Sequence, residues 1–294
     1  MTGARAFQRC AELAEAAGDP GEGTAPPAQH WFLVEHRGAW PRLALQALDP
    51  DAAAALGAWA GGTGARIVLV RRPGRRAGRA EGLRWFRVDA RPGHEGIRTG
   101  TWAGAGDLAA AVTAEGDPYD APLTLVCAHG RHDACCAVRG RPLAAALVAD
   151  DPEGTWECSH IGGCRFAPAM VLLPHGLVYG GVSPLEGPSI VRDAARGLVV
   201  PSRLRGRSAL SPAVQAAQQH ARLATGSRGV DDLRVAGVDS DGAPAGSTAW
   251  RVRFTGPDCV VEVKERFVGV DRPLTCAGRP GGRMRVFDPV RVGH

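Results

Sequence analysis

The sequence predicts an α/β fold in which one order of elements, β-α-β-β-β-α, occurs twice before a smaller α+β unit. Two observations lead to this prediction. Short apolar runs, bounded by glycine, proline or charged residues, have the length of buried strands. Alanine-rich segments of helical length lie between them. The chain has 294 residues, of which 45% are hydrophobic and 22% charged, so it is long enough for about two domains.

The first half of the chain begins with a segment of helical character at residues 5–17, followed by a Gly/Pro loop at 18–28. Asp51 marks the start of an alanine-rich helix, because acidic residues are favoured in a first helical turn. The other elements follow from the apolar runs. In chain order, we predict a strand at 31–35, the helix at 51–60, strands at 67–70, 83–88 and 97–102, and a helix at 107–113.

The second half repeats this order with different residues. Pro174 and Gly176 separate two apolar runs and predict a hairpin turn. A β-α-β half followed by a β-β-α half is how the thioredoxin fold is built, so we predict two tandem thioredoxin-like units. The alternative is one irregular α/β domain. The predicted elements are strands at 123–126, 155–158, 170–173 and 177–182, and helices at 142–148 and 189–196.

From about Arg203 the chain changes character. A polar helix at 212–224 precedes four strand-like runs separated by glycine-rich turns. These runs lie at 233–238, 249–254, 260–263 and 284–287. We predict three parts: an N-terminal thioredoxin-like unit at 1–118, a second one at 119–202, and a small α+β appendage at 203–294.

Charge and hydropathy narrow the class of protein. The formal net charge is only +5 and 5% of the residues are aromatic, which is a weak footprint for a nucleic-acid binder. No apolar run approaches the roughly 18 residues that a membrane span requires, and residues 1–10 contain no apolar signal core. We therefore expect a cytoplasmic protein with neither nucleic acid nor a membrane as a partner.

Cysteine and histidine are concentrated in one segment. Five of the eight cysteines lie between 127 and 164, which in a cytoplasmic chain favours metal or redox chemistry over structural disulfides. Cys127 ends a predicted strand and Cys136 precedes a predicted helix, so one loop can present both thiolates near a helix N-terminus. His160 and Cys164 flank a Gly-Gly pair, which allows positive φ angles and close backbone approach. Two soft ligands on each of two loops predict a four-ligand site.

Neighbouring residues compete with these four ligands. Cys135 adjoins Cys136, and spacing favours Cys136 as the ligand and Cys135 as a packing residue. Cys158 lies two residues before His160 and would share a strand face with it, so Cys158 is an alternative ligand. Asp133 is suited to bond backbone N–H groups of the loop. Loop or packing roles are expected for the others: His129, His132, Cys10, Cys259 and Cys276.

Several longer motifs surround these residues. They are a Cys-x8-Cys pair at 127 and 136, His-Gly-Arg-x-Asp-x-x-Cys at 129–136, Gly-Arg-Pro-Leu at 140–143, Ser-His-Ile-Gly-Gly-x-Arg-Phe-Ala at 159–167, Leu-Pro-x-Gly-x-x-Tyr-Gly at 173–180, and two upstream segments at 23–26 and 31–38. In these motifs the chain resembles the sucrase/ferredoxin-like family, whose members are thioredoxin-like ferredoxins. The resemblance covers residues 5–200 closely and the remainder loosely.

This resemblance implies one 2Fe-2S cluster, held by Cys127, Cys136, His160 and Cys164 in the unit at 119–202. Fungal members of the family carry His-x3-His where this chain has His160-x3-Cys164, and bacterial thioredoxin-like ferredoxins carry Cys-x3-Cys there. The implied ligand set is therefore three cysteines and one histidine. The implied function is electron transfer without catalysis, with redox donor and acceptor proteins as partners.

Two other functions fit the same residues. Three cysteines and one histidine also suit a tetrahedral zinc ion. A thioredoxin-like fold is also compatible with a thiol-disulfide oxidoreductase, although no Cys-x-x-Cys follows the first strand of the unit. Four arginines near the site in sequence form a candidate docking face for an acidic redox partner: Arg131, Arg139, Arg141 and Arg165.

Overall fold

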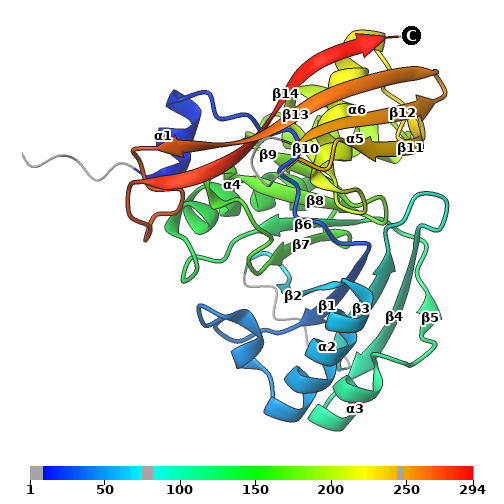
Figure 1. Ribbon diagram of the computed structural model, residues 1–294. Coiled ribbons are helices and arrows are strands. Elements are labelled where there is room, and N and C mark those ends of the chain that lie inside the picture. The colour runs from blue at the N-terminus through cyan, green and yellow to red at the C-terminus, as the bar shows by residue number, and fades with distance from the viewer. Residues whose placement is uncertain (1–8, 75–81, 244–247, 294) are drawn as a thin grey trace, which may run out of the picture.

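Two β-sheets organise the chain, a ten-stranded mixed sheet and a four-stranded antiparallel sheet (Figure 1). The computed structural model describes residues 9–74, 82–243 and 248–293. Helices and strands alternate along most of the chain, which confirms the predicted α/β class. No helix in these described ranges is long and apolar enough to cross a membrane.

The first half of the large sheet follows the predicted order. Its elements are β1 (His30–Glu35), α2 (Pro50–Thr63), β2 (Arg66–Arg71), β3 (Leu83–Asp89), β4 (Gly96–Trp102) and α3 (Ala105–Ala110). β1 pairs in parallel with β2 and antiparallel with β3, and β3 pairs antiparallel with β4. Asp49 rather than Asp51 caps α2, because the Asp49 side chain accepts a hydrogen bond from the Asp51 backbone N at 2.9 Å.

The second half repeats this pairing with its own strands. Its elements are β6 (Leu123–Cys127), α4 (Ala134–Asp150), β7 (Thr155–Cys158), β8 (Ala169–Leu173), β9 (Leu177–Gly180) and α5 (Gly187–Ala195). β6 pairs in parallel with β7 and antiparallel with β8, and β8 pairs antiparallel with β9. The strand neighbours and directions are therefore the same in both halves.

The two halves join edge to edge into one sheet. β2 pairs antiparallel with β7, with Val70 opposite Cys158. Trp31 and Leu33 of β1 share one buried apolar cluster with Leu125 and Trp156 of the second half. With β5 (Asp117–Pro118) and β10 (Leu204–Arg207) at its two edges, the sheet has the order β10-β9-β8-β6-β7-β2-β1-β3-β4-β5. β10 thus belongs to the large sheet, although we predicted residues from 203 onward to form the appendage.

Helix α4 begins well before the predicted start at 142. Asp133 provides the N-cap, because its Oδ1 accepts a hydrogen bond from the Cys135 backbone N at 2.9 Å. Pro142 lies inside the helix instead of at its first turn. A Cβ at Gly140 would lie 2.1 Å from the carbonyl oxygen of Cys127, so glycine permits α4 to lie directly against the end of β6. The early start places Cys135 and Cys136 in the first helical turn.

The C-terminal part packs one helix on the small sheet. Its elements are α6 (Pro212–Thr225), β11 (Arg234–Ser240), β12 (Ala249–Thr255), β13 (Cys259–Val270) and β14 (Gly282–Gly293). β13 and β14 are longer than the predicted strands at 260–263 and 284–287, and they pair from Val260 to Val270 with one register shift after Glu262. Figure 1 shows the far end of this hairpin beside α1 (Cys10–Ala16). Residues 5–8 of the helix predicted at 5–17 lie outside the described residues.

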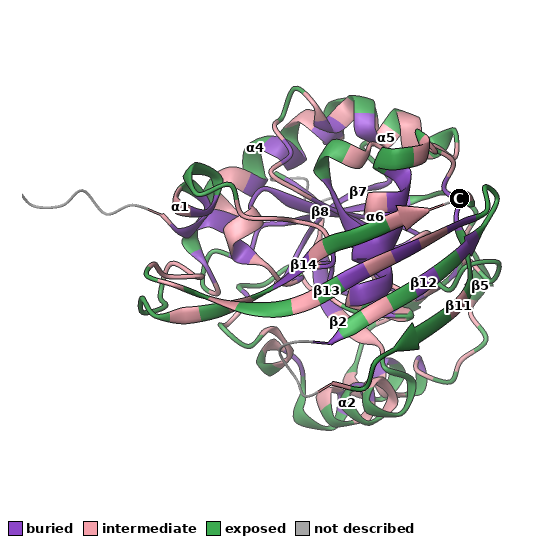
Figure 2. Cartoon of the chain, turned by 45° about the horizontal axis from the view of Figure 1, so that its top comes forward, coloured by how far each residue is buried: buried purple, intermediate pink, exposed green. Residues whose placement is uncertain are grey.

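Burial follows this layering, as Figure 2 shows for the central strands of the large sheet. All residues of β6, β7 and β8 are buried. The parallel pair β6 and β7 therefore ends inside the protein, and the loops that leave both strands start from a buried edge. Three short 3₁₀ helices complete the described elements: η1 (Ala44–Ala47), η2 (Cys164–Phe166) and η3 (Pro201–Arg203).

Candidate metal centre

The structure brings the four predicted ligands together; we call Cys127, Cys136, His160 and Cys164 the central group. The Cys127 and Cys136 sulfurs and a ring nitrogen of His160 all lie within 4.8 Å of one another. The Cys164 Sγ lies 3.4 Å from His160 Nδ1. The three cysteines are buried and His160 is half-buried. The donor atoms of Cys136 and His160 thus each lie near those of both Cys127 and Cys164.

Strand pairing explains this convergence. β6 and β7 run parallel, with Cys127 opposite Cys158, so the loops that follow them leave the sheet at the same edge. Cys127 is the last residue of β6, and Cys136 lies in the first turn of α4. His160 follows β7, and Cys164 begins η2. The sequence order strand, loop and helix therefore delivers all four side chains to one place.

The Gly-Gly pair between His160 and Cys164 has the predicted positive φ angles, 96° at Gly162 and 74° at Gly163. A side chain at Gly163 would collide with Arg205, since a Cβ there would lie 2.3 Å from Arg205 Nη2. Two features thus require glycine at position 163, the positive φ angle of the turn and the buried arginine of β10. The expected close approach of this backbone to an inorganic group stays a prediction.

Proton sharing in the central group favours thiolates at Cys127 and Cys164 and keeps the proton on Cys136, because its hydrogen bonds to those two sulfurs raise the pKa of Cys136 strongly. Hydrogen bonding from the Cys136 thiol is the largest influence that lowers the pKa of Cys127, and it lowers the pKa of Cys164 to about 7. Burial alone would lower the pKa of His160, but its contacts with the Cys127 and Cys164 sulfurs outweigh burial and raise that pKa to about 9. Since the thiolate is the form that binds metals, Cys127 and Cys164 are prepared for a cation, whereas Cys136 would release its proton when a metal binds.

Two further histidines support the loop after β6. The His160 backbone N donates to His129 Nδ1 at 3.2 Å, and His129 Nε2 donates to the Pro41 carbonyl at 2.8 Å. His129 therefore anchors the loop as a neutral imidazole, and burial lowers its pKa. The His132 ring stacks on the His160 ring with centroids 3.6 Å apart. A nitrogen of His132 also lies within 4.8 Å of donor atoms of His160 and Cys164, so His132 is a further candidate ligand that sequence reasoning treated as a loop residue.

The two cysteines that competed with the predicted ligands lie apart from the central group. Cys135 points instead toward Cys10 and Cys276, with sulfur-sulfur distances of 3.6 and 3.2 Å. Cys158 is fully buried in the core cluster, and burial raises its pKa strongly. Among the described residues, Cys158 belongs to none of the groups whose donor atoms converge. Cys10 and Cys276, for which packing was the expected role, thus form a second cluster of thiols with Cys135.

Arg205 is a part of the site that the sequence did not reveal. Its side chain is 2% exposed, and it donates from Nε to Thr24 Oγ1 at 3.0 Å and from Nη1 to the Gly162 carbonyl at 3.1 Å. Burial lowers the pKa of Arg205 to about 9, and the charges of Cys164 and Cys127 act in the opposite direction. A buried cation therefore adjoins the thiolates and holds the glycine loop.

The four arginines of the predicted docking face differ in their contacts. Arg139 forms an ion pair with Glu15 at 2.9 Å, and Arg165 forms one with Asp19 at 3.2 Å. Arg131 and Arg141 are exposed. Arg131 and Arg141 are thus the members of the predicted face that are most open to solvent.

Comparison with known proteins identifies the family. No curated protein and no solved structure matches the chain. Residues 22–206 match the family model described as Sucrase/ferredoxin-like. This range includes the whole central group and more than half of the chain. The protein therefore belongs to the sucrase/ferredoxin-like family.

Proposed function

We propose that the protein binds one 2Fe-2S cluster and transfers electrons. The observation that carries this proposal is the convergence of three buried cysteines and one half-buried histidine from the loops after two parallel strands. Thiolate and imidazole are the donors that such clusters use, so the donor set fits the group. Cys127, Cys136, His160 and Cys164 would hold the cluster, which would supply a one-electron redox couple.

The ligands and charged residues of this chain would set the potential of that redox couple and the route by which electrons reach it. One imidazole in place of a thiolate removes a negative charge from the centre and raises its potential. His160 and the stacked His132 are half-buried whereas the three cysteines are buried, so the histidine side is the path by which electrons would enter and leave. The exposed residues Arg131 and Arg141 favour an acidic redox donor or acceptor protein.

Anaerobic purification followed by iron and sulfide counts, and EPR of the dithionite-reduced protein, tests the proposal. We expect about two iron and two sulfide per chain and the EPR signal of a reduced 2Fe-2S cluster. A colourless protein that contains no iron after anaerobic purification, and that takes up none on reconstitution with iron and sulfide, would refute it.

A zinc ion is the second candidate for the central group. The observation that favours it is the compactness of the group, since the donors of Cys127, Cys136 and His160 lie within 4.8 Å of one another. A donor set of three cysteines and a histidine suits tetrahedral zinc. The same metal analysis decides between zinc and the iron-sulfur cluster. Stoichiometric zinc in the wild-type protein that is lost from Cys136→Ser would support zinc at the central group in place of the cluster.

We also propose that the strands of the large sheet up to β9 form two thioredoxin-like units, divided at residue 118 and ending near residue 202, with β10 added at the edge and only the second unit holding the cluster. The identical strand neighbours and directions of the two halves support this proposal. A cytoplasmic location fits eight unpaired cysteines, because that compartment keeps thiols reduced.

His160 is expected to couple reduction to proton uptake. A histidine ligand has a second ring nitrogen that binds a proton more tightly when the cluster carries the additional negative charge. The midpoint potential should therefore fall as pH rises, by up to about 59 mV per pH unit. In His160→Cys the potential should be lower and independent of pH. If the slope persists in His160→Cys and disappears in His132→Ala, then His132 is the ligand.

Arg205 is expected to raise the potential. A buried cation stabilises the more negative, reduced cluster, so Arg205→Met should lower the midpoint potential by roughly 70 mV, given a unit charge about 10 Å away at an effective dielectric of about 20. Arg207→Met, in the same strand, is the matched control because Arg207 is paired with Glu95. Equal shifts in both variants would show that loss of the strand's packing, and not the charge of Arg205, alters the potential.

A further inference from the structure

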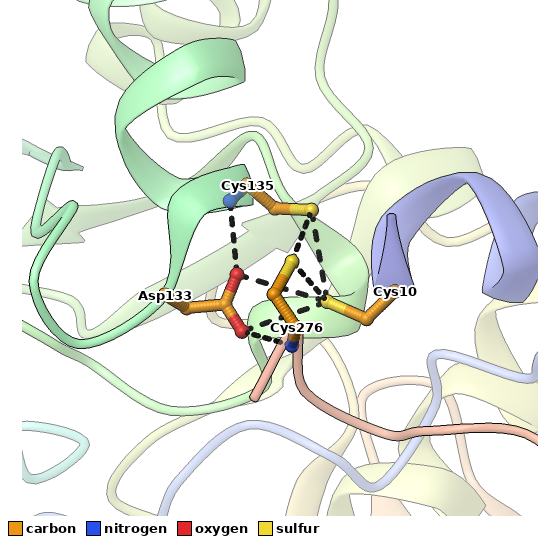
Figure 3. A group of neighbouring side chains, drawn as sticks. All are labelled: Cys10, Asp133, Cys135 and Cys276. Atoms are coloured by element: carbon orange, nitrogen blue, oxygen red, sulfur yellow. Dashed lines mark hydrogen bonds between the residues drawn. The ribbon is translucent and has the colours of Figure 1, made fainter. Parts of the chain in front are cut away.

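A second cluster of metal-binding side chains lies beside the central group; we call Cys10, Asp133, Cys135 and Cys276 the hairpin group (Figure 3). The sulfurs of Cys10 and Cys135 are 3.6 Å apart, those of Cys135 and Cys276 are 3.2 Å apart, and those of Cys276 and Cys10 are 3.6 Å apart. The three thiols therefore form a nearly equilateral triangle.

Asp133 closes one side of this triangle. Its carboxylate oxygens lie 3.7 and 3.6 Å from the Cys10 sulfur. Each oxygen also accepts one backbone hydrogen bond, from Cys135 N at 2.9 Å and from Cys276 N at 2.8 Å. A carboxylate oxygen has two lone pairs, so these bonds orient the carboxylate and leave acceptor capacity for a cation.

We propose that the hairpin group binds one zinc ion through the three thiolates and a carboxylate oxygen of Asp133. Tetrahedral zinc with Zn–S bonds of about 2.3 Å requires sulfurs about 3.8 Å apart, which is close to the spacing that the protein already has. A disulfide would join only two of the sulfurs and leave the third thiol against a carboxylate. The compact triangle also favours a single ion over a cluster of several metals.

The surroundings suit such an ion. Cys10 and Cys135 are fully buried, Asp133 is 3% exposed, and Cys276 is half-buried, so the ion would be shielded from chelators on most sides. Arg165 lies close enough to Cys10 for their charges to interact, and it shares the buried carboxylate of Asp19 with Arg272. Two arginines around one aspartate leave a net positive charge to balance the anionic ligands.

The ion would have a structural role, because its ligands come from three distant segments. Cys10 is in α1, Cys135 is in the first turn of α4, and Cys276 is in the turn between β13 and β14. One zinc ion would thus fasten the tip of the C-terminal hairpin to the N-terminal helix and to the helix that carries Cys136. Metal-ligand bonds of this kind contribute directly to folding free energy.

Zinc and iron counts on the full-length protein, purified anaerobically and washed with EDTA, test the proposal. We expect about one tightly bound zinc per chain, and Cys276→Ser should retain less than about a fifth of it with an unchanged iron content. Cys136→Ser should show the reverse, which separates this site from the proposed cluster. Cys259→Ser, which removes a buried thiol of β13, is the matched control and should retain both metals.

Thiol labelling of the wild-type protein avoids reliance on a variant that folds poorly. Zinc removal by a strong chelator should make Cys10, Cys135 and Cys276 react with iodoacetamide at least about tenfold faster, while the three cysteines of the central group keep their rate. The proposal is overturned if the protein lacks zinc and takes up none on addition of zinc salt, if mass spectrometry finds a Cys135–Cys276 disulfide, or if zinc is lost from Cys136→Ser and retained in Cys276→Ser.

Discussion

Cys136→Ser is expected to abolish iron binding, whereas Cys135→Ser, one residue earlier, is expected to leave the iron content unchanged. The reason is direction: Cys136 contacts Cys127 and Cys164, and Cys135 contacts Cys10 and Cys276. A serine hydroxyl in place of the Cys136 thiolate removes a soft ligand and leaves the helix start intact, because Asp133 still accepts from the backbone of residue 135.

Iron analysis and the visible spectrum measure this difference. The iron content should fall from about two per chain to near zero in Cys136→Ser, and the visible charge-transfer bands should vanish with it. Wild-type iron and an unaltered EPR signal in Cys136→Ser would remove Cys136 from the ligand set. Loss of iron from both variants would indicate that the first turn of α4, and not one thiol, is what the centre requires.

Gly140→Ala is expected to destabilise the fold by about 3 kcal/mol or more, because overpacking in a close contact forces the backbone apart. A Cβ at this position would lie 2.1 Å from the carbonyl oxygen of Cys127, the last residue of β6 and a proposed cluster ligand. Displacing α4 from β6 would also separate Cys136 from Cys127. The variant should therefore lose both stability and iron.

Urea denaturation of both the iron-loaded and the iron-free protein measures the stability change. Gly57→Ala in α2 is the matched control, since a Cβ there meets nothing within 4 Å. That substitution should stabilise the protein slightly, by up to about 1 kcal/mol, because alanine is the better helix former. A Gly140→Ala protein as stable as wild type would show that the helix moves away at little cost, and the close contact would then have no structural importance.

The sequence predicted most elements of the large sheet, because their signals are local. The runs at 67–70 and 170–173 are apolar over strand length, and the structure has strands there. The start of α4 was predicted wrongly because proline usually marks a first helical turn, whereas here Pro142 lies inside the helix and Asp133 provides the cap. The sequence did not predict β10, because every second residue of Leu204–Arg207 is an arginine. These arginines are buried only through contacts with distant segments of the chain.

The candidate site shows the same division between local and distant signals. The four residues of the central group follow from spacing within two short segments, and the structure brings them together. The hairpin group has members at 10, 133, 135 and 276, so no spacing pattern connects them before the chain folds. Arg205 was equally hidden, since its contacts with Thr24 and Gly162 arise only when β10 pairs at the sheet edge.

The first turn of α4 fixes more than a helix boundary. Successive residues of an α-helix point about 100° apart, so Cys135 and Cys136 address two different groups from adjacent positions. Inserting one residue between Asp133 and Cys135 would rotate both side chains by that angle and exchange or misdirect their partners. A loop of different length between Cys127 and Asp133 is compatible with both groups only if Cys135 and Cys136 keep their present orientations about the axis of α4. The residue at which α4 begins therefore determines which group each of the two thiols contacts.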